Sequence, residues 1–428
     1  MKTWKLKKGA DRRIRSGHPW VFTSELESSP KTIQSGEPIE LVDTSGKTVA
    51  YGYGSSVSQI SFRALDVQGL YTNAATPEFV AEKVVQAWDY RNSLGYKNSF
   101  RVCFGEADFL PGLVVDRYLG INGDQVIAFQ VLTAGMQTIL ADPKTFFKKL
   151  VQRLNEKKIS DISWEKTVVV KRNDVNIRKL EGLAVEPPEV ISDYLIDKEL
   201  LQNYTFKHDK NEVQFTCDLL EGQKTGFFLD QSYNIEKFSQ ILQRVSWNQK
   251  EIKILDLCCY VGQWSTLVAY HLKKAFPEIK ITVTLVDVSD SALKFAQKNT
   301  SAFADLVEIK KLDVVHDLEQ LSSQTYDLVI ADPPAFIKAK KDLPNGQHAY
   351  MKMNEQAFRV AKKEGFVVSC SCSGLMTEEL LQEALRKGMS RARVNAHCLF
   401  KGGHAPDHPQ LVQFPEGSYL KMLVHRTI

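Results

Sequence analysis

The chain has 428 residues, of which 43% are hydrophobic and 25% charged, a length that favours two or three domains. No stretch reaches the roughly 18 unbroken apolar residues of a membrane span, and the N-terminus lacks the apolar core of a signal peptide, so we expect a cytoplasmic protein without membrane contact. The cysteines number seven and lack metal-ligand spacing, which predicts reduced thiols and no metal site.

Residues 1–72 are predicted to form a small β-barrel. Apolar runs at 39–42, 49–53 and 60–65 are separated by turn residues, and no long helical pattern interrupts them. The net charge of +4 is too weak to indicate a polyanionic partner by itself. Basic side chains nevertheless crowd the first 15 residues, a pattern that suits phosphate contacts and equally a solvated terminus.

Residues 73–195 are predicted to form a second, α+β domain. Thr76 is suited to cap a helix with Pro77 in its first turn, and apolar residues recur at helical spacing as far as Trp88. A second helix is expected from Pro143 to about Lys157. The expected strands lie around residues 101–104, 113–117, 126–132 and 167–171.

Residues 196–428 are predicted to form an α/β domain that begins with a hairpin over 203–230. Strand and helix patterns alternate from residue 235 onward, which indicates a parallel sheet. The expected strands are residues 252–257, 281–287, 307–310, 328–331 and 365–369.

Four features follow successive strands of this α/β domain. The first strand ends in a turn whose one glycine, Gly262, cannot supply the glycines of a dinucleotide fingerprint. Asp287 then suits ribose hydroxyls, Asp313 suits an adenine amino group, and Asp332 opens a stiff loop with two prolines. Each also has an ordinary structural interpretation, such as a helix cap for Asp287. Their order resembles that of class I methyltransferases dependent on S-adenosylmethionine.

Cys372, just after the fifth strand, is a candidate nucleophile. Carbon 5 of cytosine reacts poorly with a methyl donor until a thiolate adds to carbon 6, so cytosine-5 methylation needs such a group. Simple packing is the alternative, because free cysteines are often buried. Cys370 fits packing better, since it lies nearer the strand interior.

Seven segments carry a more specific resemblance. They are residues 17–22 (GHPWVF), 112–117 (GLVVDR), 224–231 (KTGFFLDQ), 332–336 (DPPAF), 371–377 (SCSGLMT), 407–409 (DHP) and 414–421 (FPEGSYLK). Together they resemble, over nearly the whole chain, the bacterial 23S rRNA cytosine-5 methyltransferases that carry an N-terminal PUA domain. The resemblance implies an RNA-binding PUA barrel at 1–72, a middle α+β domain at 73–195 and a Rossmann-like catalytic domain at 196–428.

The resemblance also implies the cofactor and the partners. S-adenosylmethionine is the expected cofactor, 23S rRNA or its large-subunit precursor is the expected partner, and a homodimer is suggested. The cofactor would be bound by Phe228, Asp230, Gln231, Cys259, Tyr260, Val261, Gly262, Asp287, Val288, Asp313, Asp332 and Pro333. Cys372 would be the nucleophile. RNA would contact Lys7, Arg13, Arg15, His18 and Trp20, and the unstacked target base would meet Pro334 and Phe336.

Three departures from the family pattern concern the active site. Ser232 replaces an arginine, Gln263 replaces a glycine, and Ala335 stands where related enzymes place a second cysteine. Removal of the proton from carbon 5 then falls to Asp332 or to a water that it orients. Methylation of guanine N7 or of a base amino group is an alternative, as is an inactive RNA-binding assembly factor.

Overall fold

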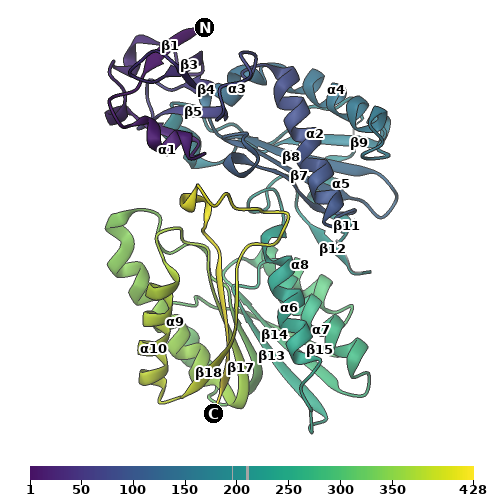
Figure 1. Cartoon of the computed structure of the whole chain (residues 1–428). Coiled ribbons are helices and arrows are strands. Elements are labelled where there is room, and N and C mark those ends of the chain that lie inside the picture. The colour runs from purple at the N-terminus through teal and green to yellow at the C-terminus, as the bar shows by residue number, and fades with distance from the viewer. Residues whose placement is uncertain (195, 209–211) are drawn as a thin grey trace. The chain divides into compact units, whose positions relative to one another are not determined.

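The computed structural model describes residues 1–194, 196–208 and 212–428. The chain forms two compact units, each built from more than one stretch of sequence (Figure 1). The first unit contains Met1–Glu212, Asp218–Leu229 and Pro406–Gly417, and the second contains Val213–Cys217, Asp230–Ala405 and Ser418–Ile428. The predicted hairpin and the predicted boundary at residue 195 lie partly outside the described residues. The three predicted domain ranges therefore stay a prediction.

The N-terminal part of the first unit is a five-stranded sheet in the order β1-β3-β4-β5-β2. Its strands are β1 (Lys2–Lys5), β2 (Trp20–Phe22), β3 (Pro38–Val42), β4 (Thr48–Gly54) and β5 (Ile60–Asp66). The three runs predicted as strands are β3, β4 and β5, and the short helix α1 (Asp11–Arg15) follows β1. Alternate residues such as Ile39 and Leu41 share a core with Phe62, as expected for strands buried on one face.

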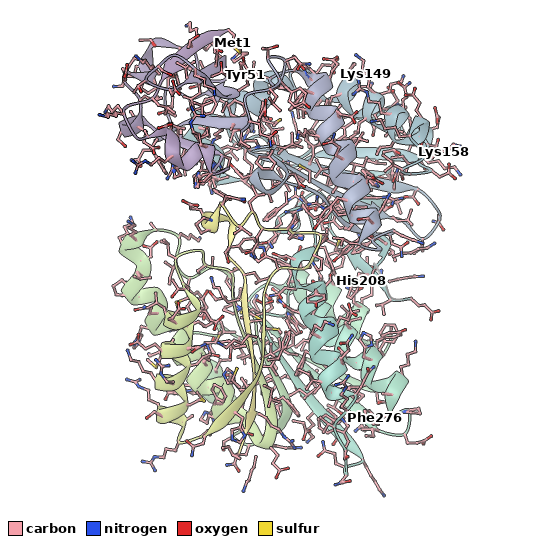
Figure 2. All side chains as sticks on the ribbon, in the orientation of Figure 1. Met1, Tyr51, Lys149, Lys158, His208 and Phe276 are labelled. Atoms are coloured by element: carbon pink, nitrogen blue, oxygen red, sulfur yellow. The ribbon has the colours of Figure 1, made fainter. Side chains whose placement is uncertain are left out.

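A second five-stranded sheet of the first unit has the order β10-β9-β8-β7-β6. Its strands are β6 (Phe100–Phe104), β7 (Leu113–Leu119), β8 (Gln125–Val131), β9 (Thr167–Lys171) and β10 (Glu189–Val190). Its helices are α2 (Pro77–Ser93), α3 (Ala134–Ile139), α4 (Pro143–Glu156) and α5 (Lys198–Gln202). Thr76 caps α2 as predicted, because its hydroxyl accepts the amide N–H of Phe79 over 3.3 Å. Figure 2 labels Lys149 on α4 and Lys158 just beyond its end, and both are exposed.

A late segment of the chain, Pro406–Gly417, completes the first unit although it lies within the predicted catalytic range. The carbonyl of Asp407 accepts two hydrogen bonds from the guanidinium of Arg91, at 3.0 and 3.2 Å. The Asp407 carboxylate accepts the amide N–H of Arg101 over 2.9 Å. Both arginines are buried, so the segment supplies acceptors that the unit's interior requires.

The second unit is built on a seven-stranded sheet in the order β15-β14-β13-β16-β17-β19-β18. Its strands are β13 (Glu251–Leu257), β14 (Lys280–Asp287), β15 (Leu306–Lys311), β16 (Tyr326–Ala331), β17 (Ala361–Ser371), β18 (Ala396–Gly402) and β19 (Lys421–Thr427). The five predicted parallel strands are confirmed. The sheet is mixed rather than parallel, because β18 and β19 pair antiparallel at one end.

Helices cover both faces of this sheet. They are α6 (Ser232–Leu242), α7 (Gln263–Ala275), α8 (Asp290–Thr300), α9 (Leu343–Val360) and α10 (Glu378–Ala392). Figure 1 shows α9 and α10 on one face and α6, α7 and α8 on the other. The strand order reverses between β13 and β16, and α/β sheets bind ligands at the carboxyl ends of strands at such a point. No helix of the described ranges is both long enough and apolar enough to cross a bilayer.

Candidate active site

The turn that follows β13 has an unusual backbone. Cys258, Tyr260 and Gly262 have φ values of +60°, +50° and +74°, in the left-handed region that side chains disfavour. Gly262 is required for packing as well, because a Cβ there would lie 2.8 Å from the Thr300 hydroxyl. Such strained turns persist where the surrounding structure holds them, often at functional sites. The turn includes the predicted residues Cys259 and Val261, both buried.

Asp287 holds this turn from the end of β14. Its carboxylate accepts the amide N–H of Tyr260 over 3.0 Å and that of Ser289 over 2.9 Å. The cap of α8 is Ser289, whose hydroxyl accepts the amide of Ala292 over 3.3 Å. Capping of α8 therefore falls to Ser289, and the role of Asp287 toward a ribose stays a prediction. The neighbouring Val288 is exposed.

Asp313 follows β15 and resembles Asp287 in its bonding. Its carboxylate accepts the amide N–H of Val315 over 2.7 Å, and its own amide N–H is donated to Asp317 over 2.9 Å. Asp313 is only half-buried, so a ligand can reach it. As predicted, Asp313 follows its strand, β15, which is the neighbour of β14, the strand that ends at Asp287.

Asp332 is held by two side-chain donors. Its Oδ2 accepts the side-chain N–H of Gln231 and the indole N–H of Trp264, each over 2.9 Å. The side-chain oxygen Oε1 of Gln231 in turn accepts the side-chain N–H of Asn234 over 2.7 Å. The structure thus brings together two predicted residues, Gln231 and Asp332, and adds Trp264, which the sequence did not reveal.

Asp230 is hydrogen-bonded to Tyr419, which lies two residues before β19. The hydroxyl of Tyr419 donates to the Asp230 carboxylate over 2.5 Å. The amide N–H groups of Tyr419 and Leu420 both donate to Nε2 of His404, over 3.1 and 3.0 Å. Tyr419 belongs to a family segment to which sequence reasoning gave no role.

Asp256 lies inside β13 and belongs to none of the predicted site residues. Its Oδ2 accepts the hydroxyl of Ser265 over 2.5 Å and the Ser265 amide over 3.2 Å. Its side chain is almost fully buried, and this burial raises its pKa to about 7. Asp256 is therefore protonated below about pH 7, unlike an ordinary aspartate.

The acidity of the site decides which ligands fit it. Asp287, Asp313 and Asp332 follow β14, β15 and β16, beside the reversal of strand order. Carboxylates accept from hydroxyl and amino groups and attract cations, whereas they repel phosphates. S-adenosylmethionine carries a sulfonium, an ammonium, ribose hydroxyls and an adenine amino group. These residues fit that molecule better than a dinucleotide.

Cys372 lies one residue beyond β17, at the same edge of the sheet. Its Sγ is 3.8 Å from the carbonyl oxygen of Pro333 and is half-buried. Cys370 is fully buried, and burial raises the pKa of its thiol well above the usual value. The structure therefore favours packing for Cys370 and places Cys372 beside the Asp-Pro-Pro loop.

Hydroxyl groups fix the turn that carries Cys372. The Ser371 hydroxyl donates to Tyr350 over 2.9 Å, and the Tyr350 and Ser373 hydroxyls are 3.0 Å apart. The ring of Phe336 packs edge-on against Tyr350, with 4.9 Å between ring centres. Phe336 is thus partly committed to packing, whereas Pro334 is exposed.

The basic residues predicted to contact RNA lie in the first unit with intramolecular partners. Lys7 donates to a backbone carbonyl over 2.8 Å, Arg13 lies 3.4 Å from Glu25, and Arg15 lies 2.7 Å from Asp43. These pairs are partly exposed, so solvent screens them. Their role toward RNA stays a prediction.

The predicted residues His18 and Trp20 belong to a packed cluster of the first unit. The ring of Phe414 lies 5.4 Å from that of His18 and 4.6 Å from that of Trp20. His18 bonds to Glu416 over 3.2 Å, and the Trp20 indole donates to Glu106 over 2.9 Å. His18 is 4% exposed, so its structural contribution accompanies any role toward RNA.

Phe228, predicted to border the cofactor, also belongs to the first unit. The ammonium of Lys224 lies 4.5 Å from the centre of its ring, a distance suited to a cation–π contact. The role of Phe228 toward the cofactor stays a prediction.

Comparison with known proteins agrees with this geometry. A PUA-like domain matches residues 5–66, and a methyltransferase domain matches residues 248–413. Ribosomal RNA large subunit methyltransferase I of Tolumonas auensis is 30% identical, over 99% of this chain and 98% of that protein. The protein of that name from Yersinia pseudotuberculosis is 28% identical, over 97% of each chain.

Two solved structures are similar along their whole length. One is a Streptococcus mutans protein assigned to the SAM-dependent methyltransferases, with a TM-score of 0.74 and 15% identity. The other, assigned to the methyltransferases and complexed with SAH, has a TM-score of 0.73 and 16% identity. Each comparison covers 100% of both chains, and at these identities it shows the fold.

Proposed function

The chain belongs to the ribosomal RNA large subunit methyltransferase I family, and we propose that it forms 5-methylcytidine in 23S rRNA through a covalent bond to Cys372. It is an S-adenosylmethionine-dependent methyltransferase with a PUA-like domain. The observation that carries the proposed chemistry is the position of Cys372, whose Sγ lies 3.8 Å from the Pro333 carbonyl at the strand ends that carry the acids.

The cofactor would be held by the acids and by the turn after β13. Asp287 accepts from the ribose hydroxyls, and Asp313 accepts from the adenine amino group. Residues 259–262 bring backbone close to the ligand, while Asp230 and Gln231 border it. Bound S-adenosylmethionine supplies an electrophilic sulfonium methyl group, which carbon 5 of the activated cytosine takes.

Cys372 would activate the base before the methyl group is transferred. Its thiolate adds to carbon 6, forming an S–C6 bond and making carbon 5 nucleophilic. Asp332 then accepts the proton of carbon 5, the S–C6 electrons return to sulfur, and the thiolate leaves. Asp332 suits this role because Gln231 and Trp264 fix the orientation of its carboxylate.

RNA binding would use the first unit together with the Asp-Pro-Pro loop of the second. Exposed phosphates would be neutralised by basic side chains, which makes binding sensitive to salt. The proposed RNA contacts are Lys7, Arg13, Arg15, His18 and Trp20, with Pro334 and Phe336 reserved for the unstacked target base.

The test is methylation of unmodified 23S rRNA by the full chain. The RNA is incubated with protein and S-adenosylmethionine, digested to nucleosides and analysed by mass spectrometry. We expect 5-methylcytidine with the wild type and with Cys398→Ala, a matched control because Cys398 is exposed. We expect none with Cys372→Ala.

Two results would overturn the proposal. If Cys372→Ala still forms a methylated purine, the chain performs another RNA methylation chemistry. S-adenosylmethionine binding with no methylated nucleoside in naked or particle-bound rRNA would favour an assembly factor.

A further inference from the structure

Lys421 approaches the turn of Cys372 from the neighbouring strand. It begins β19, where its backbone pairs with Ser371, the last residue of β17. Its ammonium donates to the carbonyl of Ser373 over 2.7 Å and to the carbonyl of Tyr419 over 2.8 Å. Ser371, which pairs with Lys421, and Ser373, whose carbonyl Lys421 binds, thus flank Cys372.

The Lys421 ammonium has one N–H beyond the two that bond these carbonyls. An ammonium has three N–H bonds, and two are directed to carbonyls. Lys421 is half-buried, and burial lowers its pKa to about 8, whereas the charge of a Cys372 thiolate acts in the opposite direction and raises it. The two groups are therefore close enough to influence each other's ionisation.

We propose that Lys421 is a positioning residue that maintains Cys372 as a thiolate by donating its third N–H to Sγ. The inference rests on the proposed role of Cys372 as the nucleophile. The thiol releases its proton to solvent, and the Lys421 ammonium, which keeps its own protons, stabilises the thiolate that remains. Formation of the S–C6 bond consumes the thiolate, and its cleavage restores the thiolate.

The acidic groups near Cys372 act against its ionisation. Asp332 follows β16 and Cys370 lies on β17, and both disfavour a nearby thiolate when they are charged. Tyr350 on α9 is neutral at ordinary pH, because burial raises its pKa to about 12. Lys421 is the cation that the described side chains place against the turn, beside the carbonyl groups that already bind it.

The experiment measures the ionisation of Cys372 without RNA or cofactor. The full chain is treated briefly with iodoacetamide from pH 5 to 10, and mass spectrometry gives the alkylation rate at each cysteine. The variants are Lys421→Met, which removes the charge, and Lys421→Arg, which restores it. Lys387→Met is the control, because Lys387 is exposed on α10 and pairs only with Glu383 among the described contacts.

We expect the alkylation midpoint of Cys372 to lie below that of the exposed Cys398 in the wild type. Lys421→Met should raise it by about one pH unit or more, which means at least a tenfold loss of thiolate at pH 7. Lys421→Arg and Lys387→Met should leave it near the wild-type value. The maximal rate at pH 10 should match in all variants, which separates ionisation from misfolding.

An unchanged midpoint in folded Lys421→Met would overturn the inference. Methylation provides the second readout: Lys421→Met should reduce kcat at pH 7 and recover part of it at pH 9, with KM for RNA unchanged. A fall in kcat that is equal at both pH values would assign Lys421 a structural role. If Cys372→Ala still methylates RNA, the proposed function fails. The inference on Lys421 and Cys372 still stands in that case, provided that Lys421→Met shifts the alkylation midpoint of Cys372.

Discussion

The indole Nε1–H of Trp264 is bonded to Oδ2 of Asp332 over 2.9 Å. The first turn of α7 thereby fixes the orientation of a carboxylate at the end of β16. Gln231 donates to the same oxygen atom, so two donors from different elements define its position. A carboxylate held in this way loses little freedom when it accepts a proton or orients a water.

Trp264→Phe removes this donor and keeps most of the ring volume. We expect kcat for methylation to fall about tenfold, the usual effect of losing one hydrogen bond to a charged group. Trp247→Phe is the matched control, because its indole bonds to the Leu242 carbonyl over 3.1 Å. Equal effects of the two substitutions on kcat would contradict the role given to Trp264.

Asp332→Asn should stop the reaction after the covalent bond has formed. An amide cannot accept the proton of carbon 5, so the base stays attached to Cys372. We expect a protein–RNA adduct that survives denaturing electrophoresis. The double substitution Asp332→Asn with Cys372→Ala should abolish it, and release of free product at the wild-type rate would exclude Asp332 as the base.

Asp287→Asn should weaken S-adenosylmethionine binding about 10- to 100-fold, because charged acceptors contribute more than neutral ones. An asparagine oxygen can still accept the Tyr260 amide, although the contact with the Ser289 amide is lost, so the turn should remain folded. Calorimetry gives the Kd, and Asp290→Asn is the control, since Asp290 is exposed and pairs with Lys311. Loss of affinity in both variants would indicate a general charge effect.

Asp256 should make stability depend on pH. Its pKa is raised from 3.8 to about 7, so the folded chain retains a proton that the unfolded chain releases. This contribution is complete below pH 4 and is lost as pH rises through 7, by at most about 4 kcal/mol. Asp256→Asn should reduce that loss in urea titrations between pH 4.5 and 8. Parallel curves for the two proteins would contradict the assignment.

Sequence patterns predicted the elements whose signal is local. The parallel strands of the second unit are runs of apolar residues, and the cap of α2 lies in three consecutive positions. The antiparallel strands β18 and β19 escaped prediction because neither alternates: β18 has no buried residue, and β19 has four buried residues in a row. Their pairing is decided by distant partners on β17.

The same distinction separates the predicted site residues from the missed ones. Asp287, Asp313 and Asp332 each follow a strand, so their order along the chain was informative. Trp264 and Lys421 act through contacts with residues 68 and 48 positions away, which no local pattern reveals. Lys421 did fall in a resembling segment, and that was the one available signal.

The segment Pro406–Gly417 is synthesised late, although it belongs to the N-terminal unit. A ribosome that has synthesised the first 400 residues has delivered Arg91 and Arg101 but not Asp407, whose carbonyl and carboxylate they bind. Until then, Arg91 and Arg101 retain their pairs with Asp108 and Asp116, but the contacts with Asp407 are missing. Termination before residue 406 would leave both units incomplete, because residues 406–417 belong to the first unit and residues 418–428 to the second.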